Sequence, residues 1–220
     1  MTRFAEAGGA ARLTQSLRAA CIVILACSLN GCALWHMLFG EPRPHTEASV
    51  VAASSGPPLP ADVQSSFAHG VAALQRGDWA TAEQVFTTLA SSHPELPGPA
   101  VNLAIVYRRT GRAQQAETLL QQTAERFPRF APAQHQLGLL LSEQGKFDAA
   151  DAALRQAIDA DPDYAVAYYN RAVVNDLYLQ RPDVALQDFR QYQALQPQPD
   201  PQVAGWIAEL ERRTGQEVSQ

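Results

Sequence analysis

Apolar side chains recur at helical spacing in the middle of the chain. Leu103 and Tyr107 stand four residues apart, and so do Leu137 and Leu141. Residues four apart lie on the same side of an α-helix, so each pair forms a short apolar stripe. We expect these four side chains to lie in the core, where their helices face neighbouring helices.

A second apolar stripe lies close to the C-terminus. Val203, Trp206, Ile207 and Leu210 follow the order i, i+3, i+4, i+7, and charged residues occupy other positions of the same segment. This pattern predicts an amphipathic helix that packs on the fold with one face and meets water with the other. Residues 198–220 are therefore predicted to form a capping helix and a tail.

Three columns of small or helix-ending residues repeat with one period of 34 residues. A glycine relieves a tight turn between two helices, an alanine lets two helices approach closely, and a proline ends a helix. The period therefore predicts a series of short helix pairs. The columns are Gly77, Gly111 and Gly145; Ala82, Ala116 and Ala150; and Pro94, Pro128 and Pro162.

Further residues keep the same period. They are Leu137-Gly138 and its variant Leu103-Ala104, the aromatic Tyr107, the turn Gly145-Lys146-Phe147, and the large apolar Phe86, Leu120 and Leu154. Together they resemble the tetratricopeptide repeat (TPR) family, whose unit is a pair of antiparallel helices. The resemblance implies an all-α fold, a right-handed α-solenoid of about four TPR helix pairs plus the capping helix. The predicted repeats are 63–96, 97–130, 131–164 and 165–197.

The fourth repeat departs from the period. The interval from Pro162 to Pro197 is 35 residues, and Gln180-Arg181-Pro182-Asp183 stands where the turn glycine is expected. Pro182 suits the first position of a helix, because its fixed backbone angle matches the helical one. We therefore predict one inserted residue at this turn and a regular second helix after it.

The N-terminus has the order of a secretory signal. Three arginines within the first 18 residues precede the apolar run 19–29, and Leu29-Asn30-Gly31-Cys32 follows. This tetrapeptide resembles a bacterial lipobox, which implies that residues 1–31 are a cleaved signal peptide and that Cys32 carries lipid. The alternative is an uncleaved signal anchor at 19–40, since that stretch contains no Asp, Glu, Lys or Arg and approaches the length of a membrane span.

Both interpretations place the rest of the chain in the periplasm, because the arginines stay on the cytoplasmic side. Residues 32–62 are rich in proline, serine and alanine, which predicts a flexible tether. Ala33 follows the cysteine where an aspartate would imply retention at the inner membrane. By that resemblance we expect an outer-membrane lipoprotein, with an inner-membrane anchor as the alternative.

Composition argues against several classes of function. The net charge is -5, whereas nucleic-acid binding needs a basic surface. All three cysteines lie within the first 32 residues, and the five histidines are scattered without metal-ligand spacing. Asp148 and Asp151 begin a helix, where Asp151 stands four residues before Arg155, which indicates helix electrostatics. We expect no enzyme, cofactor, metal, nucleic acid or small-molecule substrate.

The resemblance also implies a partner-binding groove lined by the first helix of each repeat. Asn102 and Asn170 occupy corresponding positions, and an asparagine there can hold a peptide backbone or be an ordinary solvated residue. Arg108 and Arg109 could hold an acid, whereas the only lysine, Lys146, lies in a turn. The predicted groove residues are Phe67, Val71, Asn102, Ile105, Arg108, Arg109, His135, Gln136, Leu139, Tyr169, Asn170 and Val173.

An anchor, a tether and a repeat array indicate a non-catalytic scaffold that binds one or more envelope proteins. It is similar to the small TPR lipoproteins associated with type IV and Flp pili and their secretins, which implies a part in assembling an envelope complex. Two alternatives remain open. The chain could be an adaptor that regulates peptidoglycan hydrolases or proteases, or an accessory of an energised inner-membrane transport complex.

Overall fold

The computed structural model describes residues 59–215, which form nine α-helices in chain order. The first eight pair as the first and second helices of four repeats, and the ninth follows them. The predicted signal, Cys32 and the tether up to residue 58 lie outside the described residues. The helices are α3 (Ala61–Gln75), α4 (Trp79–Ser92), α5 (Pro97–Arg109), α6 (Ala113–Arg126), α7 (Ala131–Glu143), α8 (Phe147–Ala160), α9 (Ala165–Leu177), α10 (Pro182–Leu195) and α11 (Pro201–Thr214).

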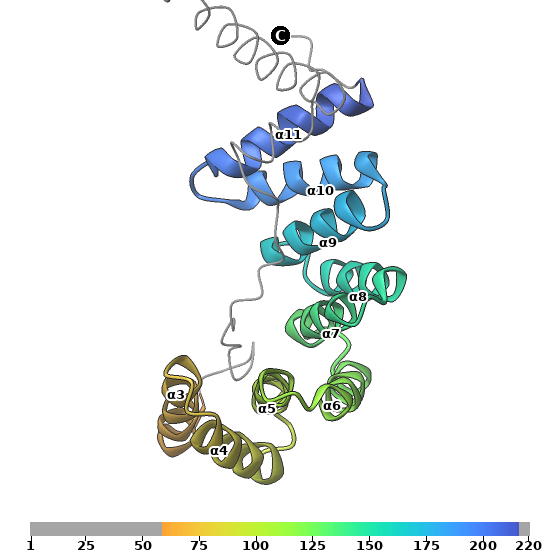
Figure 1. Cartoon of the computed structure of the whole chain (residues 1–220). Helices are drawn as coiled ribbons and strands as arrows, with labels where there is room; N and C mark the ends of the chain where they lie inside the picture. The colour runs from red at the N-terminus through yellow and green to blue at the C-terminus, as the bar shows by residue number, and fades with distance from the viewer. Residues whose placement is uncertain (1–58, 216–220) are drawn as a thin grey trace, which may run out of the picture. The chain divides into compact units, whose positions relative to one another are not determined.

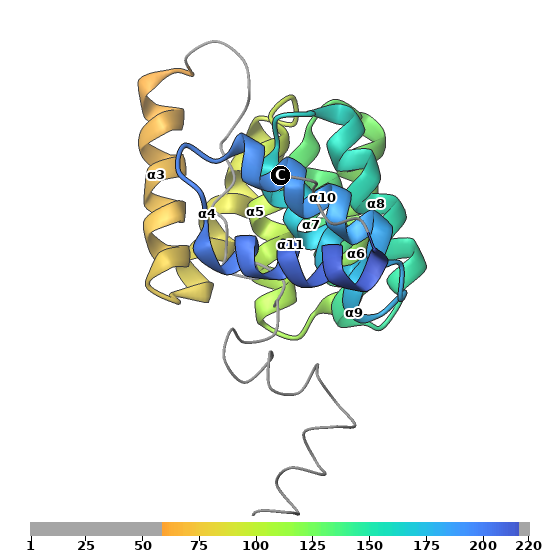
Figure 2. The ribbon, with the colours of Figure 1, turned by 90° about the horizontal axis from the view of Figure 1, so that it is seen from above.

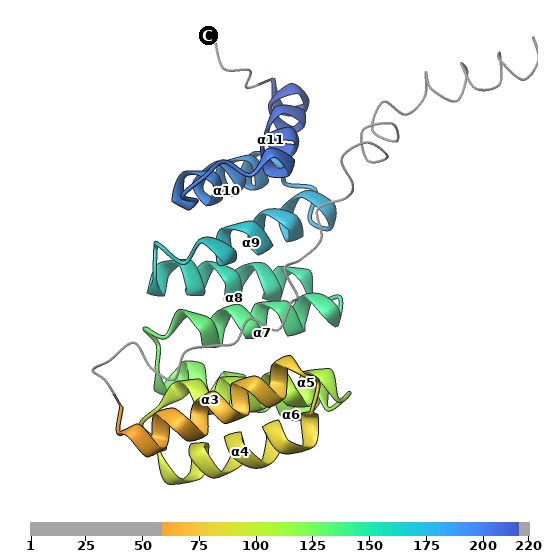
Figure 3. The ribbon, with the colours of Figure 1, turned by 90° about the vertical axis from the view of Figure 1, so that its left-hand side faces the viewer.

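The helices form an all-α solenoid, as the sequence predicts. Each helix packs against the next one along the chain, and α7 also contacts α5 and α9. Figure 1 shows α5 and α7 on one side of the array and α6 and α8 on the other. Figure 3 shows the layers following one another in chain order from α7 to α11. Each repeat therefore packs chiefly on its sequence neighbours, as in other solenoids.

The turns inside the repeats use a left-handed residue. Gly77, Gly111 and Gly145 have φ angles of 72°, 79° and 74°, which side chains with a Cβ rarely adopt. In the fourth repeat Gln180 takes this conformation with φ 54°. Pro182 is the first residue of α10. The predicted one-residue insertion therefore lengthens the turn without disturbing the helix that follows.

Close approach between helices occurs at the small residues. Ala82, Ala116 and Ala150 are fully buried. A Cβ built on Gly138 would lie 2.6 Å from Cγ of Leu154, which is too close for two carbon atoms. The Leu-Gly pair of the third repeat therefore allows α7 and α8 to touch.

Helix α11 covers the last repeat, as the apolar stripe predicts. Val203, Trp206 and Leu210 are buried in a cluster with residues of α9 and α10. The Trp206 ring lies 5.9 Å from the ring of Tyr169 and 5.5 Å from that of Phe189. Figure 2 looks along the array with α11 beside α10. The ninth helix therefore closes the apolar core.

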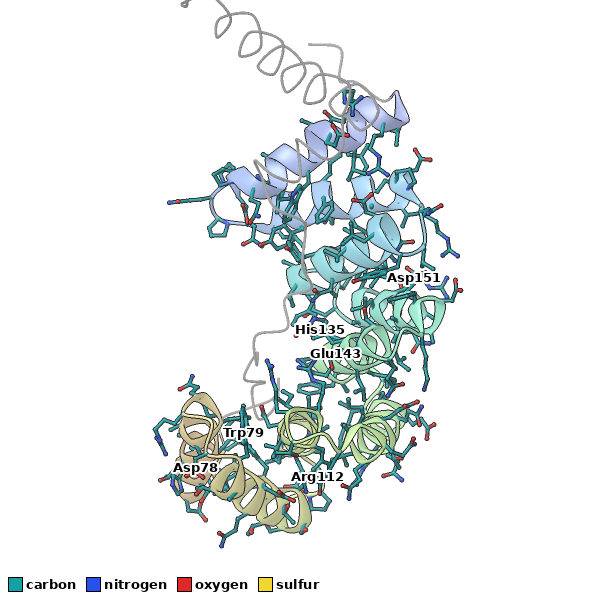
Figure 4. The ribbon with its side chains drawn as sticks, in the orientation of Figure 1. Asp78, Trp79, Arg112, His135, Glu143 and Asp151 are labelled. Carbon is teal, nitrogen blue, oxygen red and sulfur yellow. The ribbon has the colours of Figure 1, made fainter. Side chains whose placement is uncertain are left out.

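Ion pairs join consecutive repeats. An acidic residue on a second helix pairs with the basic residue that follows the next turn, and Figure 4 labels Arg112 and Asp151 among them. Asp151 also accepts a hydrogen bond from Asn175 Nδ2 at 2.7 Å. The three pairs are Glu83 with Arg112, Glu117 with Lys146, and Asp151 with Arg181.

Candidate functional site: the first-helix face

The predicted groove residues lie on the first helices of the four repeats. Phe67 and Val71 are half-buried on α3, and Phe67 packs its ring edge against Phe86 at a centroid distance of 5.6 Å. These two residues therefore serve the packing of the first repeat. The residues on α5, α7 and α9 come closer together, because these helices lie side by side.

We use the name first-helix face for the surface that α5, α7 and α9 form with Ile105, Arg108, Gln136, Leu139 and Asn170. Ile105 and Leu139 are 1% and 2% exposed, and Gln136 and Asn170 are each 1% exposed. The face thus combines aliphatic side chains with amide and guanidinium groups. Arg109, next to Arg108, is exposed at its margin.

An ion pair links the second repeat to the third on this face. Nη1 of Arg108 donates to Oε1 of Glu143 at 2.9 Å, and the Arg108 side chain is only 5% exposed. Burial lowers the pKa of Arg108, and the Glu143 carboxylate opposes this shift. The Nη2 atom of the same guanidinium is buried without a hydrogen-bond partner. Arg108 therefore keeps donor capacity for an anionic or carbonyl oxygen.

A histidine links the third repeat to the fourth. Nδ2 of Asn170 lies 2.8 Å from Nε2 of His135, and the Tyr164 hydroxyl lies 3.4 Å from Nδ1. The His135 and Tyr164 rings also meet edge to face. Figure 4 labels His135 and Glu143 on α7. Two predicted residues, His135 and Asn170, are thus brought into direct contact across a repeat boundary.

Amide side chains form a column with the period of the repeat. Asn102, Gln136 and Asn170 occupy the same position in the second, third and fourth repeats, and all three are buried. Nδ2 of Asn102 donates to the Gly98 carbonyl at 3.0 Å. Both Nε2 and Oε1 of Gln136 are buried without a partner. Gln136 therefore offers a donor and an acceptor side by side, as a peptide group requires.

Two predicted residues belong to the core. Tyr169 packs against Phe189 at a centroid distance of 5.7 Å and against Trp206, and Val173 lies fully buried in the same cluster. Their positions on α9 match the groove positions of the family, but their side chains pack against α10 and α11. The apolar character of both residues is accounted for by this packing.

Sequence reasoning missed Glu143 and Tyr164, which partner Arg108 and His135. Each pair is separated by about one repeat, and no local pattern marks either partner. Only the stacking of α7 against α5, and the approach of the turn before α9, bring them together. Charged residues that recur with the period of the repeat would have been the sequence signal for such pairs.

Three further observations on residues 59–215 concern a hollow, metal ligands and membrane-spanning helices. A hollow of about 480 Å³ opens between α3 and α4, with apolar Val63, Val85 and Leu89 and with His69 and His93 among its lining residues. Within residues 59–215, no group of three metal-ligating side chains occurs. In the same part of the chain, no helix is both long enough and apolar enough to cross a bilayer.

Comparison with known families agrees with this architecture. Tetratricopeptide repeat models match residues 63–86, 95–163 and 135–200. The chain therefore belongs to the tetratricopeptide repeat family. Members of this family are typically non-catalytic, and the fold implies a scaffold for protein–protein interaction.

Solved structures share the fold. MamA is 22% identical, with 66% of this chain and 84% of that chain covered and a TM-score of 0.56. TTC0263, a thermophilic TPR protein of Thermus thermophilus, is 24% identical, with 70% and 83% covered and a TM-score of 0.56. PilF of Pseudomonas aeruginosa is 21% identical, with 70% and 69% covered and a TM-score of 0.61. The comparison with curated proteins gives no match.

Proposed function

We propose that this chain is a membrane-anchored scaffold of the bacterial envelope that holds an extended segment of another envelope protein on its first-helix face. Its role is to assist assembly of an envelope complex such as a pilus or a secretion apparatus. The signal-like N-terminus with Cys32 supports the anchor, with the outer membrane as the favoured location. The unpaired polar atoms of Arg108 and Gln136 support the binding mode.

The chemistry of the face favours an extended peptide over a folded surface. The Gln136 amide matches the donor and acceptor of a main-chain peptide group, and Nη2 of Arg108 can receive a carboxylate or a carbonyl. The buried Ile105 and Leu139 are the apolar side chains of the same face. An extended chain presents its peptide groups, whereas a helix has already paired its own.

The test is capture of partners with matched variants. We would purify the full-length, membrane-extracted protein after cross-linking in its native cells, and compare wild type with an Arg108→Gln/Gln136→Ala double variant. The matched control is Arg155→Gln/Gln156→Ala on α8, where both residues are exposed. Loss of a charge-assisted hydrogen bond weakens binding by about tenfold or more. We therefore expect pilus or secretion subunits with wild type and control, and their loss with the double variant.

Equal capture by all three proteins would overturn the proposed binding mode. Thermal unfolding of each variant shows whether the array is intact, so a lost partner is not mistaken for a lost fold. If the partners are hydrolases or proteases and their reaction rates change on addition of the protein, the regulatory adaptor replaces the assembly scaffold.

The same sample also tests how the chain is attached to the membrane. Mass spectrometry of the N-terminal peptide should show a chain that begins at an acylated Cys32. An intact N-terminus together with inner-membrane partners would instead identify an anchored accessory of a transport complex.

A further inference from the structure

A hollow of about 320 Å³ opens at the edge of the third repeat, where the N-terminus of α7 lies beside the C-terminus of α8. This volume lies at the lower end of the range of roughly 300–1,000 Å³ that is typical of sites for small molecules. The polar groups in it are a guanidinium, a carboxylate and two amides. We call it the third-repeat hollow, and its lining residues are Pro128, Arg129, Gln134, Gln156, Asp159 and Ala160.

The two charged residues of the third-repeat hollow stand at unfavourable helix ends. Arg129 comes two residues before Ala131, the first residue of α7, and no side chain caps that N-terminus. Asp159 lies in the last turn of α8, which contains no basic residue. The N-terminus of a helix carries a partial positive charge, and its C-terminus carries a partial negative charge. Each side chain thus adds to the charge of the helix end beside it instead of offsetting that charge.

Arg129 and Asp159 do not compensate each other either. Within residues 59–215, neither residue forms an ion pair or a side-chain hydrogen bond, although both line the same hollow. A third group also lacks a partner, since Oε1 of Gln134 is buried without a hydrogen bond. Buried polar atoms in folded proteins nearly always have a partner. The hollow therefore presents a cation, an anion and an acceptor that the described part of the chain leaves unpaired.

The fold of a repeat does not require this combination of residues. In the second repeat, 34 residues earlier, the three positions hold Glu95, Ala100 and Glu125. In the fourth repeat, Asp163 takes the place of the arginine. Both repeats form the same kind of helix pair without a basic residue at this turn. The packing of the repeat therefore does not explain the charges of the third-repeat hollow.

We propose that the third-repeat hollow binds a small zwitterion that carries an ammonium and a carboxylate on one carbon atom, as α-amino acids do. The carboxylate of the ligand pairs with Arg129, beside the positive N-terminus of α7. Its ammonium pairs with Asp159, beside the negative C-terminus of α8. An ammonium has three donors, so it also serves Oε1 of Gln134. One ligand thereby satisfies all three groups and complements both helix ends.

The third-repeat hollow contains none of the residues of the first-helix face. Its ligand is a small molecule, whereas the first-helix face is proposed to hold a segment of another protein. The inference therefore goes beyond the proposed function and does not depend on it.

Saturation-transfer NMR on the full-length, detergent-extracted protein tests the proposal with alanine as the probe. Two alanine derivatives are matched controls, because N-acetylalanine keeps only the carboxylate and alanine amide keeps only the ammonium. We expect alanine to bind with a Kd on the order of 1 mM. Each derivative should bind about tenfold more weakly, because one charge-assisted contact is lost.

Substitutions at the charged residues give a second comparison. Arg129→Gln and Asp159→Asn should each weaken the binding of alanine about tenfold. Arg155→Gln and Glu125→Gln, at exposed positions outside the hollow, should leave it unchanged. Neither Arg129→Gln nor Asp159→Asn should lower the melting temperature, because each removes an unfavourable charge at a helix end. A loss of binding in these two variants is then not a loss of fold.

Lysine acylated at Nζ distinguishes two sources of the same chemistry. Binding as tight as that of alanine would mean that the hollow recognises the zwitterion at the end of a larger molecule, whereas binding of alanine alone would assign a free amino acid. The proposal would be overturned by equal binding of alanine and its two derivatives, by unchanged binding in Arg129→Gln and Asp159→Asn, or by the absence of saturation transfer to alanine. Partner capture does not enter this experiment, so its failure leaves the proposed function standing.

Discussion

Arg112 and Glu83 form a two-pronged ion pair between the first two repeats. Nη1 donates to Oε1 at 2.6 Å and Nη2 to Oε2 at 2.7 Å. The guanidinium also lies 4.5 Å above the centre of the Tyr107 ring, which fixes its plane. Lys146 with Glu117 and Arg181 with Asp151 repeat the arrangement further along the array. The ion pairs thus follow the period of the helices.

The first prediction concerns the pH dependence of the Arg112–Glu83 pair. Hydrogen bonds from Arg112 lower the pKa of Glu83 below its ordinary value of 4.5. A lowered folded-state pKa contributes stability above the unfolded pKa, and this contribution is lost as the pH falls through the folded pKa. We expect Glu83→Gln to reduce the free energy of unfolding at pH 7 and to have progressively less effect below about pH 4.5.

Urea unfolding of wild type and Glu83→Gln between pH 3 and pH 7 measures this difference. Glu125→Gln, an exposed residue on α6, is the control. A penalty for Glu83→Gln that stays constant over the whole range would contradict the prediction. In a double-mutant cycle, Arg112→Gln should remove most of the effect.

The second prediction concerns the contact between α7 and α8. Gly138→Ala should lower the free energy of unfolding by about 1–3 kcal/mol, because the new methyl group overlaps the Leu154 side chain. Chemical denaturation measures the loss. In the Gly138→Ala background, Leu154→Ala should lower the free energy of unfolding by less than it does in the wild-type background. Strict additivity of the two substitutions would show that the contact is not the cause.

The third prediction concerns the irregular turn of the fourth repeat. Gln180 adopts a left-handed conformation that costs a residue with a Cβ about 1–2 kcal/mol, whereas glycine adopts it freely. We expect Gln180→Gly to raise the melting temperature by about 2–4 °C for each kcal/mol gained. Gln187→Gly, an exposed position inside α10, is the control and should lower it. A lower melting temperature for Gln180→Gly would mean that its side chain has a stabilising role.

The fourth prediction concerns the C-terminal cap. Trp206→Ala should lower the free energy of unfolding by about 3–5 kcal/mol, because the indole fills the space between Tyr169 and Phe189. Since repeats in a solenoid are stabilised by their neighbours, α9 and α10 should open before α3 to α6. Hydrogen exchange resolved by helix measures the order of opening. The exposed Gln187 on α10 offers the control, Gln187→Ala, and uniform loosening of all helices would contradict the prediction.

Only part of the first-helix face could be predicted from the sequence. The period placed Asn102 and Asn170 at corresponding positions of two first helices, and Gln136 occupies the same position on the first helix between them. It did not reveal that Arg108 pairs with Glu143 or that His135 contacts Tyr164 and Asn170. The contacts of Arg108 with Glu143 and of His135 with Asn170 cross repeat boundaries, between residues that no helical periodicity relates. Tyr169 and Val173 fit the same positional rule, yet they pack into the core beneath α10 and α11.

The sequence alone determined the repeat, its turns, its small-residue contacts and the capping helix. These features depend on local backbone angles and on residues three or four apart, which the order of amino acids encodes directly. Tertiary structure alone decided which polar groups pair and which stay buried without a partner, as Arg108 and Gln136 show. The reason is physical: a hydrogen bond between repeats depends on the relative placement of whole helices, and that placement results from the packing of the complete array.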